Sequence, residues 1–260
     1  MKLNFRQHSE HGEPVLILHG LFGSLKNWNR HARQLAEEFK VFSLDLRNHG
    51  SSPHVDIMNY PVMADDVLEF LDAQEINRTH VLGHSMGGKV AMQMALSHPT
   101  RITKLLVVDI APVAYTGNRG GHDEVFEGLS AVEPGTLTAR NEADEILAKF
   151  ISEPAIRQFL LTNLEHEEQG FRWRFNLPAL KANYDELRNN LITDKPCDKQ
   201  VLFIKGALSN YIQEDDKEHI LALFPSAKVK IVMGAGHWVH AEKPELFSKI
   251  VRDFFAEGEP

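Results

Sequence analysis

Residues 79–91 read Thr79-His80-Val81-Leu82-Gly83-His84-Ser85-Met86-Gly87-Gly88-Lys89-Val90-Ala91. The first four residues are typical of a buried strand, and the small and apolar residues at the end suit a helix. The Gly-x-Ser-x-Gly pattern between them predicts a sharp turn that presents Ser85 at the start of this helix. The glycines would leave room for the turn, and the helix N-terminus would favour negative charge near the serine hydroxyl. Ser85 is therefore the candidate nucleophile; the alternative is a glycine-rich turn with a capping serine.

Short apolar runs on both sides of this turn predict a parallel sheet. The predicted strands are Val15–Leu18, Val41–Asp45, His80–Gly83, Lys104–Asp109, Val201–Ile204 and Val229–Met233. The predicted helices between them are Asn29–Phe39, Val62–Ala73, Gly87–His98 and Pro244–Phe255. Near-continuous apolar runs suit strands that are buried on both faces. Because strands alternate with helices, we expect an α/β fold with a doubly wound, mostly parallel sheet.

The interval between Asp109 and Val201 is too long for one crossover connection. It predicts several helices, at Asp123–Val132, Ala143–Ile151, Pro154–Leu164 and Pro178–Leu191, and a short strand or turn at Phe171–Phe175. We expect residues 113–196 to form a helical cap over the carboxyl edge of the sheet, where open α/β sheets bind ligands. Residues 1–112 and 197–260 would form the core. The alternative is a set of helices packed elsewhere on that core.

The composition excludes several classes of protein. Of 260 residues, 43% are hydrophobic and 25% are charged, which is ordinary for a folded globular protein. No apolar run approaches the ~18 residues of a membrane span. The net charge of −8, without a basic stripe, argues against a nucleic-acid partner. Cys197 is the single cysteine, which excludes a disulfide framework and a Cys-rich zinc site. The N-terminus does not resemble a signal peptide, so we expect a cytoplasmic protein.

A histidine-glycine loop, His19-Gly20-Leu21-Phe22-Gly23, follows the first predicted core strand. An oxyanion hole needs two backbone donors that point at the developing charge. The N–H of Met86, directly after the candidate nucleophile, would be one donor. The other would come from this loop, from Leu21 in preference to Phe22.

A second glycine-rich loop, Gly234-Ala235-Gly236-His237-Trp238, follows the last predicted strand. Among the 14 histidines, His237 has the position expected of a general base for a serine. His84 would point elsewhere, and His19 would be structural. His237 and His240 suggest a metal pair, but no cluster of Asp, Glu or Cys completes it. We therefore expect no metal, and the chemistry needs no cofactor.

Taken together, these strings resemble the α/β-hydrolase superfamily. The strings that carry the resemblance are His19-Gly20, Asp45–Ser52, residues 83–88 and Gly236-His237. Within this superfamily, the chain most resembles the bacterial YbfF-type esterases. The longer strings that carry this resemblance are His19–Ser24, Arg47–Gly50, Val108–Pro112 and Gly236–Pro244. The resemblance implies hydrolysis of carboxylic esters and leaves acyl-CoA thioesters open.

The acid of a Ser-His-acid triad must lie between Ser85 and His237 in the chain order of this superfamily. Where its members often carry an aspartate, after the penultimate strand, this chain has Ser209 and Asn210. The carboxylates of Glu214–Asp216 come later, in what would be a solvated first helical turn. Asp109 instead ends a β-branched strand. This group of esterases resembles the minority of the superfamily in which the triad acid lies at the end of this earlier strand. We predict Asp109 as the acid; the alternative is that it only bonds to backbone.

The predicted substrate is a small acyl ester or thioester. Apolar residues of the inserted segment would form its own core or line an acyl pocket, namely Val125, Phe126, Leu129, Phe159, Leu160, Trp173, Phe175 and Leu177. We expect short to medium acyl chains to be preferred. The phosphates of an acyl-CoA thioester would need a local basic site, for which the candidates are Arg119, Arg172 and Arg174.

Two alternatives remain at this level. One is C–C bond hydrolysis or a lyase step on the same triad, since a fold does not fix a function. The other is a hydrolase-fold binding protein with little turnover. The sequence does not predict an oligomeric state.

Overall fold

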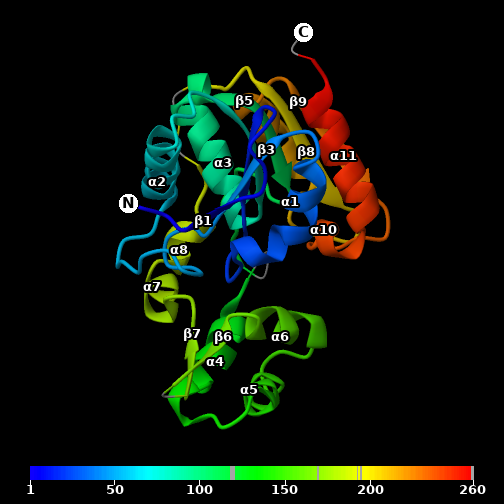
Figure 1. Cartoon of the computed structure of the whole chain (residues 1–260). Coiled ribbons are helices and arrows are strands. Elements are labelled where there is room, and N and C mark those ends of the chain that lie inside the picture. Colours follow the sequence, from blue (N-terminus) through cyan, green and yellow to red (C-terminus); the bar gives the residue numbers. More distant parts are fainter. Residues whose placement is uncertain (118–120, 169, 192, 194, 259–260) are drawn as a thin grey trace.

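The computed structural model describes residues 1–117, 121–168, 170–191, 193 and 195–258. Its centre is a seven-stranded sheet with the strand order β1-β3-β2-β4-β5-β8-β9 (Figure 1). The strands are β1 (Phe5–Gln7), β2 (Pro14–Leu18), β3 (Lys40–Leu44), β4 (Thr79–His84), β5 (Ile102–Val108), β8 (Gln200–Gly206) and β9 (Ala227–Val232). β1 is antiparallel to β3, and the other neighbouring strands are parallel. The predicted mostly parallel sheet is confirmed.

The two edges of the sheet differ from the sequence prediction. β1 was not predicted, because its three residues contain no apolar run. β9 was predicted as a strand buried on both faces, and this is wrong. It is the outer neighbour of β8, and Val229 and Ile231 are 51% and 57% exposed. An edge strand lacks the second neighbour and the full helical cover of a central strand.

Helices cover both faces of the sheet. They are α1 (Asn29–Leu35), α2 (Tyr60–Ala73), α3 (Met86–Ser97), α9 (Lys217–Leu223), α10 (Val239–Glu242) and α11 (Pro244–Ala256). Alternate residues of β2 point to opposite faces, as in any strand. Leu16 and Leu18 belong to the core cluster under α2 and α3, whereas Val15 and Ile17 belong to the cluster under α1 and α11 (Figure 1). The helical prediction for Asn29–Phe39 runs one turn too far, since α1 ends at Leu35.

The segment between β5 and β8 is called the inserted segment below. Its elements are α4 (Asp123–Ala131), α5 (Arg140–Leu147), α6 (Pro154–Leu161), β6 (Leu164–Glu167), β7 (Gly170–Trp173), α7 (Leu177–Ala182) and α8 (Tyr184–Arg188). The elements from α4 to α7 lie beneath the sheet in Figure 1, and α8 lies beside the lower end of α2. Of the strand or turn predicted at Phe171–Phe175, residues Phe171–Trp173 belong to β7 of a β6–β7 hairpin. The single helix predicted over Pro178–Leu191 is wrong, because the chain breaks at Asn183 into α7 and α8. No helix in the described ranges combines the length and apolar composition of a transmembrane span.

Lys89 of α3 binds two distant points of the inserted segment. Its side chain is buried, and its ammonium donates to the carbonyl oxygens of Val113 at 2.8 Å and Asn189 at 2.6 Å. The same ammonium lies 5.4 Å from the ring centre of Tyr60 and 4.8 Å from that of Tyr115. A buried charge needs such partners. One side chain therefore binds both of these points to the core.

Candidate active site

Ser85 occupies a strained turn between β4 and α3. Its φ of 52° lies in the left-handed region, which costs energy for a residue with a side chain. The Ser85 N–H donates to the carbonyl oxygen of Val108 at 3.0 Å. A Cβ on Gly83 would lie 2.2 Å from the carbonyl oxygen of Gly87, and a Cβ on Gly87 would lie 2.5 Å from that of His19. The turn therefore requires both glycines of the pattern.

The structure brings Asp109 and His237 together. Asp109 directly follows β5 and is 0% exposed. Its Oδ2 lies 2.8 Å from Nδ1 of His237, and its Oδ1 accepts the Gly206 N–H at 2.9 Å. The Ser209 hydroxyl also donates to Oδ2. These bonds satisfy the buried carboxylate and hold it in one orientation toward the imidazole.

The other acidic candidates lie elsewhere. Glu214 and Asp215 are exposed, as expected, whereas Asp216 is buried. The expectation of a solvated turn is therefore wrong for Asp216, because its Oδ2 accepts the Gln213 N–H at 2.8 Å and so caps the local turn.

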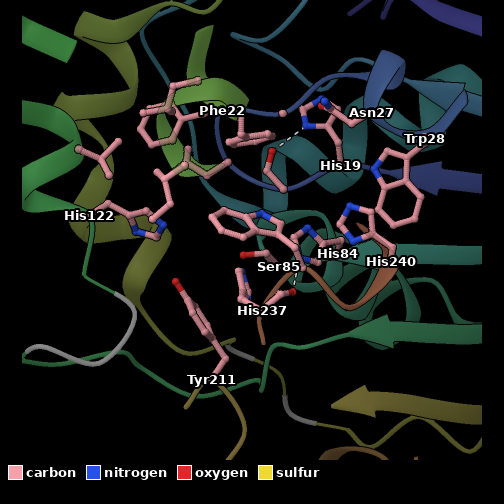
Figure 2. A pocket seen from close by; sticks show the side chains of 18 of the residues that line it. His19, Phe22, Asn27, Trp28, His84, Ser85, His122, Tyr211, His237 and His240 are labelled. Atoms are coloured by element: carbon pink, nitrogen blue, oxygen red, sulfur yellow. Dashed lines mark hydrogen bonds between the residues drawn. The ribbon is translucent and has the colours of Figure 1, made fainter. Parts of the chain in front are cut away.

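Ser85 and His237 line the same cavity, which has a volume of about 250 Å³ (Figure 2). The ring of Tyr211 stacks on the imidazole of His237, with ring centres 3.8 Å apart and planes 17° apart. Tyr211 was not predicted as a site residue, and neither was the Ser209 hydroxyl beside Asp109. Their place in the loop after β8, where relatives often carry the triad acid, is the sequence feature that could have identified them.

The loop after β2 contains two neighbouring N–H groups with different surroundings. The N–H of Phe22 donates to Nε2 of His49 at 3.1 Å. Within the described ranges, the N–H groups of Leu21 and Met86 have no hydrogen-bond acceptor. Leu21, Ser85 and Met86 also line a common, smaller cavity. The geometry therefore favours Leu21 over Phe22 as a donor for a ligand oxygen.

Histidines form part of the wall of the larger cavity. His84 lines it, contrary to expectation, and its Nε2 lies 3.1 Å from the carbonyl oxygen of His237. Burial lowers the pKa of His84 well below its usual value and lowers the pKa of His240 to about 3. Both rings are therefore neutral near pH 7 and place no positive charge beside His237. His19 is structural, as expected, because it bonds to Gly20 and to the Leu46 N–H.

The remaining wall of this cavity comes from the inserted segment. Its residues there are Gly121, His122, Val125, Ile156, Phe159 and Leu160. Of the predicted acyl-pocket residues, Val125, Phe159 and Leu160 thus line the cavity. The others belong to the hydrophobic core or pack against it, namely Phe126, Leu129, Trp173, Phe175 and Leu177.

The described lining of the larger cavity contains no Asp, Glu, Lys or Arg. Arg172 and Arg174 instead pair with Glu165, and the third phosphate candidate, Arg119, lies outside the described residues. Over the same described ranges, no three His, Cys, Asp or Glu side chains are grouped so that they could hold a metal ion. The cavity is therefore suited to a neutral, mainly apolar group.

Comparison with known proteins shows the family to which the chain belongs. A model of the alpha/beta hydrolase fold family matches residues 13–244. Esterase YbfF of Escherichia coli (strain K12) is 40% identical over 260 residues, which cover 98% of this chain and 99% of that protein. The sn-1-specific diacylglycerol lipase ABHD11 of Xenopus laevis is 42% identical over 249 residues, 94% of this chain and 80% of that protein.

Among solved structures, a marine microorganism esterase superposes with a TM-score of 0.95 at 39% identity, covering 97% of this chain and 99% of that one. These similarities confirm both the fold and the resemblance to YbfF-type esterases. The chain belongs to the α/β-hydrolase fold family and is a hydrolase of the esterase and lipase type.

Proposed function

We propose that the protein is a serine hydrolase that cleaves carboxylic esters of short to medium acyl chains through an acyl-enzyme. The observation that carries this proposal is the 2.8 Å contact between Nδ1 of His237 and Oδ2 of Asp109, on a cavity that both His237 and Ser85 line. This arrangement leaves Nε2 of His237 for the serine hydroxyl. It is the arrangement of roles that a Ser-His-Asp triad needs.

In the first half of the proposed reaction, the Ser85 hydroxyl attacks the acyl carbon while Nε2 of His237 takes its proton. Asp109 accepts the Nδ1–H bond and stabilises the imidazolium. The neutral rings of His84 and His240 add no repulsion to this charge. The C–O bond to the alcohol then breaks, and the alcohol leaves with the proton from His237.

In the second half, His237 removes a proton from water, which attacks the acyl-enzyme. The Ser85–acyl bond breaks, the acid leaves, and the proton returns to Ser85. The N–H groups of Leu21 and Met86 would bind the oxyanion in both halves. Removal of one such donor in other enzymes costs on the order of 10²- to 10³-fold in kcat.

The inserted segment would act as the cap that determines the acyl chain. Its apolar side chains and the limited cavity of about 250 Å³ support a preference for chains of short to medium length over triglycerides. Thioesters remain part of the proposal, because the acyl group that enters the cavity is the same in an ester and a thioester.

A substrate panel tests the proposal on the purified protein. It would contain nitrophenyl esters from acetate to palmitate, acetyl-CoA, a triglyceride emulsion and a vinylogous diketone. We expect the highest kcat/KM on nitrophenyl esters of short to medium chains. Faster cleavage of the diketone would replace the proposal by C–C bond hydrolysis. No turnover on the panel, with Ser85 still labelled by a fluorophosphonate, would instead favour a binding protein.

A further inference from the structure

A second cavity, of about 40 Å³, also adjoins Ser85. It differs from the larger cavity in its chemistry. Four tyrosines line it, namely Tyr60, Tyr115, Tyr184 and Tyr211. Arg188, the last residue of α8, lines it as well and is the one Lys, Arg, Asp or Glu in its described lining. Ser85 therefore lies between a larger cavity with no Asp, Glu, Lys or Arg in its described lining and a second, smaller cavity that one guanidinium lines.

The guanidinium of Arg188 has few partners in the protein. Its Nη2 donates to the carbonyl oxygen of Gly117 at 2.7 Å. The Nε is buried and has no hydrogen-bond partner. Within the described ranges no carboxylate forms an ion pair with Arg188, whereas Arg47, Arg157 and Arg172 each pair with at least one. A buried donor without a partner is costly, which indicates a ligand group at this position.

Charged groups of both signs lie near this site: Asp123 and Asp185 raise the pKa of Tyr184, although burial has the larger effect, and Tyr184 packs against Arg188. Its guanidinium lies 5.7 Å from the ring centre of Tyr184, and its charge lowers the pKa of Tyr211 against the larger opposing effect of burial. The ammonium of Lys89 lies behind Tyr60 and Tyr115. The hydroxyls of Tyr60 and Tyr115 donate to backbone carbonyls of Leu187 and Tyr211, so neither compensates the guanidinium charge.

We propose that Arg188 forms a carboxylate subsite beside Ser85 that binds the alcohol side of the substrate. The larger apolar cavity would then hold the acyl chain, and the substrate would be an acyl ester of a small hydroxy acid. A volume of about 40 Å³ suits a group of carboxylate size, and a planar guanidinium matches a carboxylate in geometry and charge. This inference rests on the proposed ester hydrolysis. Its products are the fatty acid and the free hydroxy acid, with one water consumed.

A pair of nearly isosteric esters isolates the charge. O-Butyryl glycolate and O-butyryl glycolamide share the acyl group and the ester, and they differ in a terminal carboxylate against a neutral amide. We expect the wild type to prefer the glycolate by about tenfold or more in kcat/KM, because a hydrogen bond to a charged group has that value. Arg188→Gln should abolish the preference by lowering kcat/KM on the glycolate more than on the amide.

Two controls accompany this comparison. Arg172→Gln removes another arginine of the inserted segment, one that pairs with Glu165 and Glu167 at the surface, and should keep the wild-type preference. Arg188→Lys should keep part of it, because the charge remains while the planar geometry is lost. An equal preference in the wild type and Arg188→Gln, or none in the wild type, would overturn the subsite.

Binding to Ser85→Ala separates the subsite from the catalytic proposal. The two intact esters would be titrated against Ser85→Ala and Ser85→Ala/Arg188→Gln, with tryptophan fluorescence as the readout, since Trp28 and Trp238 both line the larger cavity. Tighter binding of the glycolate that depends on Arg188 would support the subsite even if the wild type hydrolysed neither ester. Hydrolysis of both esters without a difference in binding or rate would leave the proposed function in place and contradict the subsite.

Discussion

The core and the inserted segment contribute to the candidate site in different ways. Core residues sit at strand ends and make directional contacts with short distances, as Asp109 does with His237 and Gly206. The insert contributes apolar surface, such as Phe159 and Leu160, whose contacts have no preferred direction. A small displacement therefore disrupts the first kind of contact and only reshapes the second. We expect substitutions in the core to change the rate, and substitutions in the insert to change the choice of substrate.

The strongest test of this contrast is the nucleophile. Ser85→Ala should lose turnover on the order of 10⁶-fold, as loss of a triad nucleophile does, while circular dichroism shows a folded protein. A fluorophosphonate probe should label the wild type once, at Ser85, and leave Ser85→Ala unlabelled. Robust esterase activity in the Ser85→Ala variant would contradict the assignment of Ser85 as the nucleophile.

The next largest effect concerns the acid. Asp109→Asn should lower kcat on the order of 10⁴-fold, because an amide favours the wrong tautomer of His237. Asp215→Asn is the matched control, since Asp215 is exposed on the surface, and it should cost less than about tenfold. Steady-state kinetics on one nitrophenyl ester decides between them. The reverse order of effects would assign the role of the triad acid to Asp215 instead of Asp109.

A third prediction assigns acid sensitivity to the core. Burial lowers the pKa of His31 to about 4 and those of His49 and His240 to about 3. The unfolded chain, with histidine pKa values near 6.5, binds more protons than the native state between these values. The free energy of unfolding should therefore fall as the pH drops below about 6.5, by roughly 2 kcal/mol per histidine at pH 5.

Urea unfolding at pH 7 and pH 5 measures this loss. His31→Gln should be less stable than the wild type at pH 7 because it loses contacts with Ser248 and His240. Its stability should fall less between the two pH values. A drop as steep as that of the wild type would contradict the assignment to His31.

The smallest effect should come from the insert. Phe159→Ala enlarges the larger cavity, so the ratio of kcat/KM on decanoate to that on butyrate should rise by about tenfold, since a methylene in an apolar pocket is worth about 1–3 kcal/mol. Phe171→Ala is the control, because Phe171 packs on His166 in the β6–β7 hairpin instead of lining the cavity. A loss of all activity in Phe159→Ala with native stability would contradict the expectation that residues of the insert change the choice of substrate and not the rate.

Sequence patterns predicted the sheet and the candidate residues that belong to local motifs. Ser85 is marked by the glycines that its turn requires, and Asp109 and His237 by their place at strand ends. Contacts between distant loops were not accessible in this way. The choice between Leu21 and Phe22 depends on His49, and Asp216 is buried through its bond to the Gln213 backbone, which its charged neighbours concealed. Boundaries in the insert failed where a hairpin and a break at Asn183 interrupted helical patterns.

The buried ammonium of Lys89 has a consequence for local unfolding. If either point that it binds, Val113 or Asn189, separated from the core alone, the charge would lose one acceptor while it remained away from water, which is costly. The two points should therefore open together, as one cooperative unit. Lys89 lies in the first turns of α3, and its own backbone N–H donates to the Ser85 carbonyl oxygen. Amide hydrogen exchange at the two points and at the start of α3 should therefore follow a common opening event.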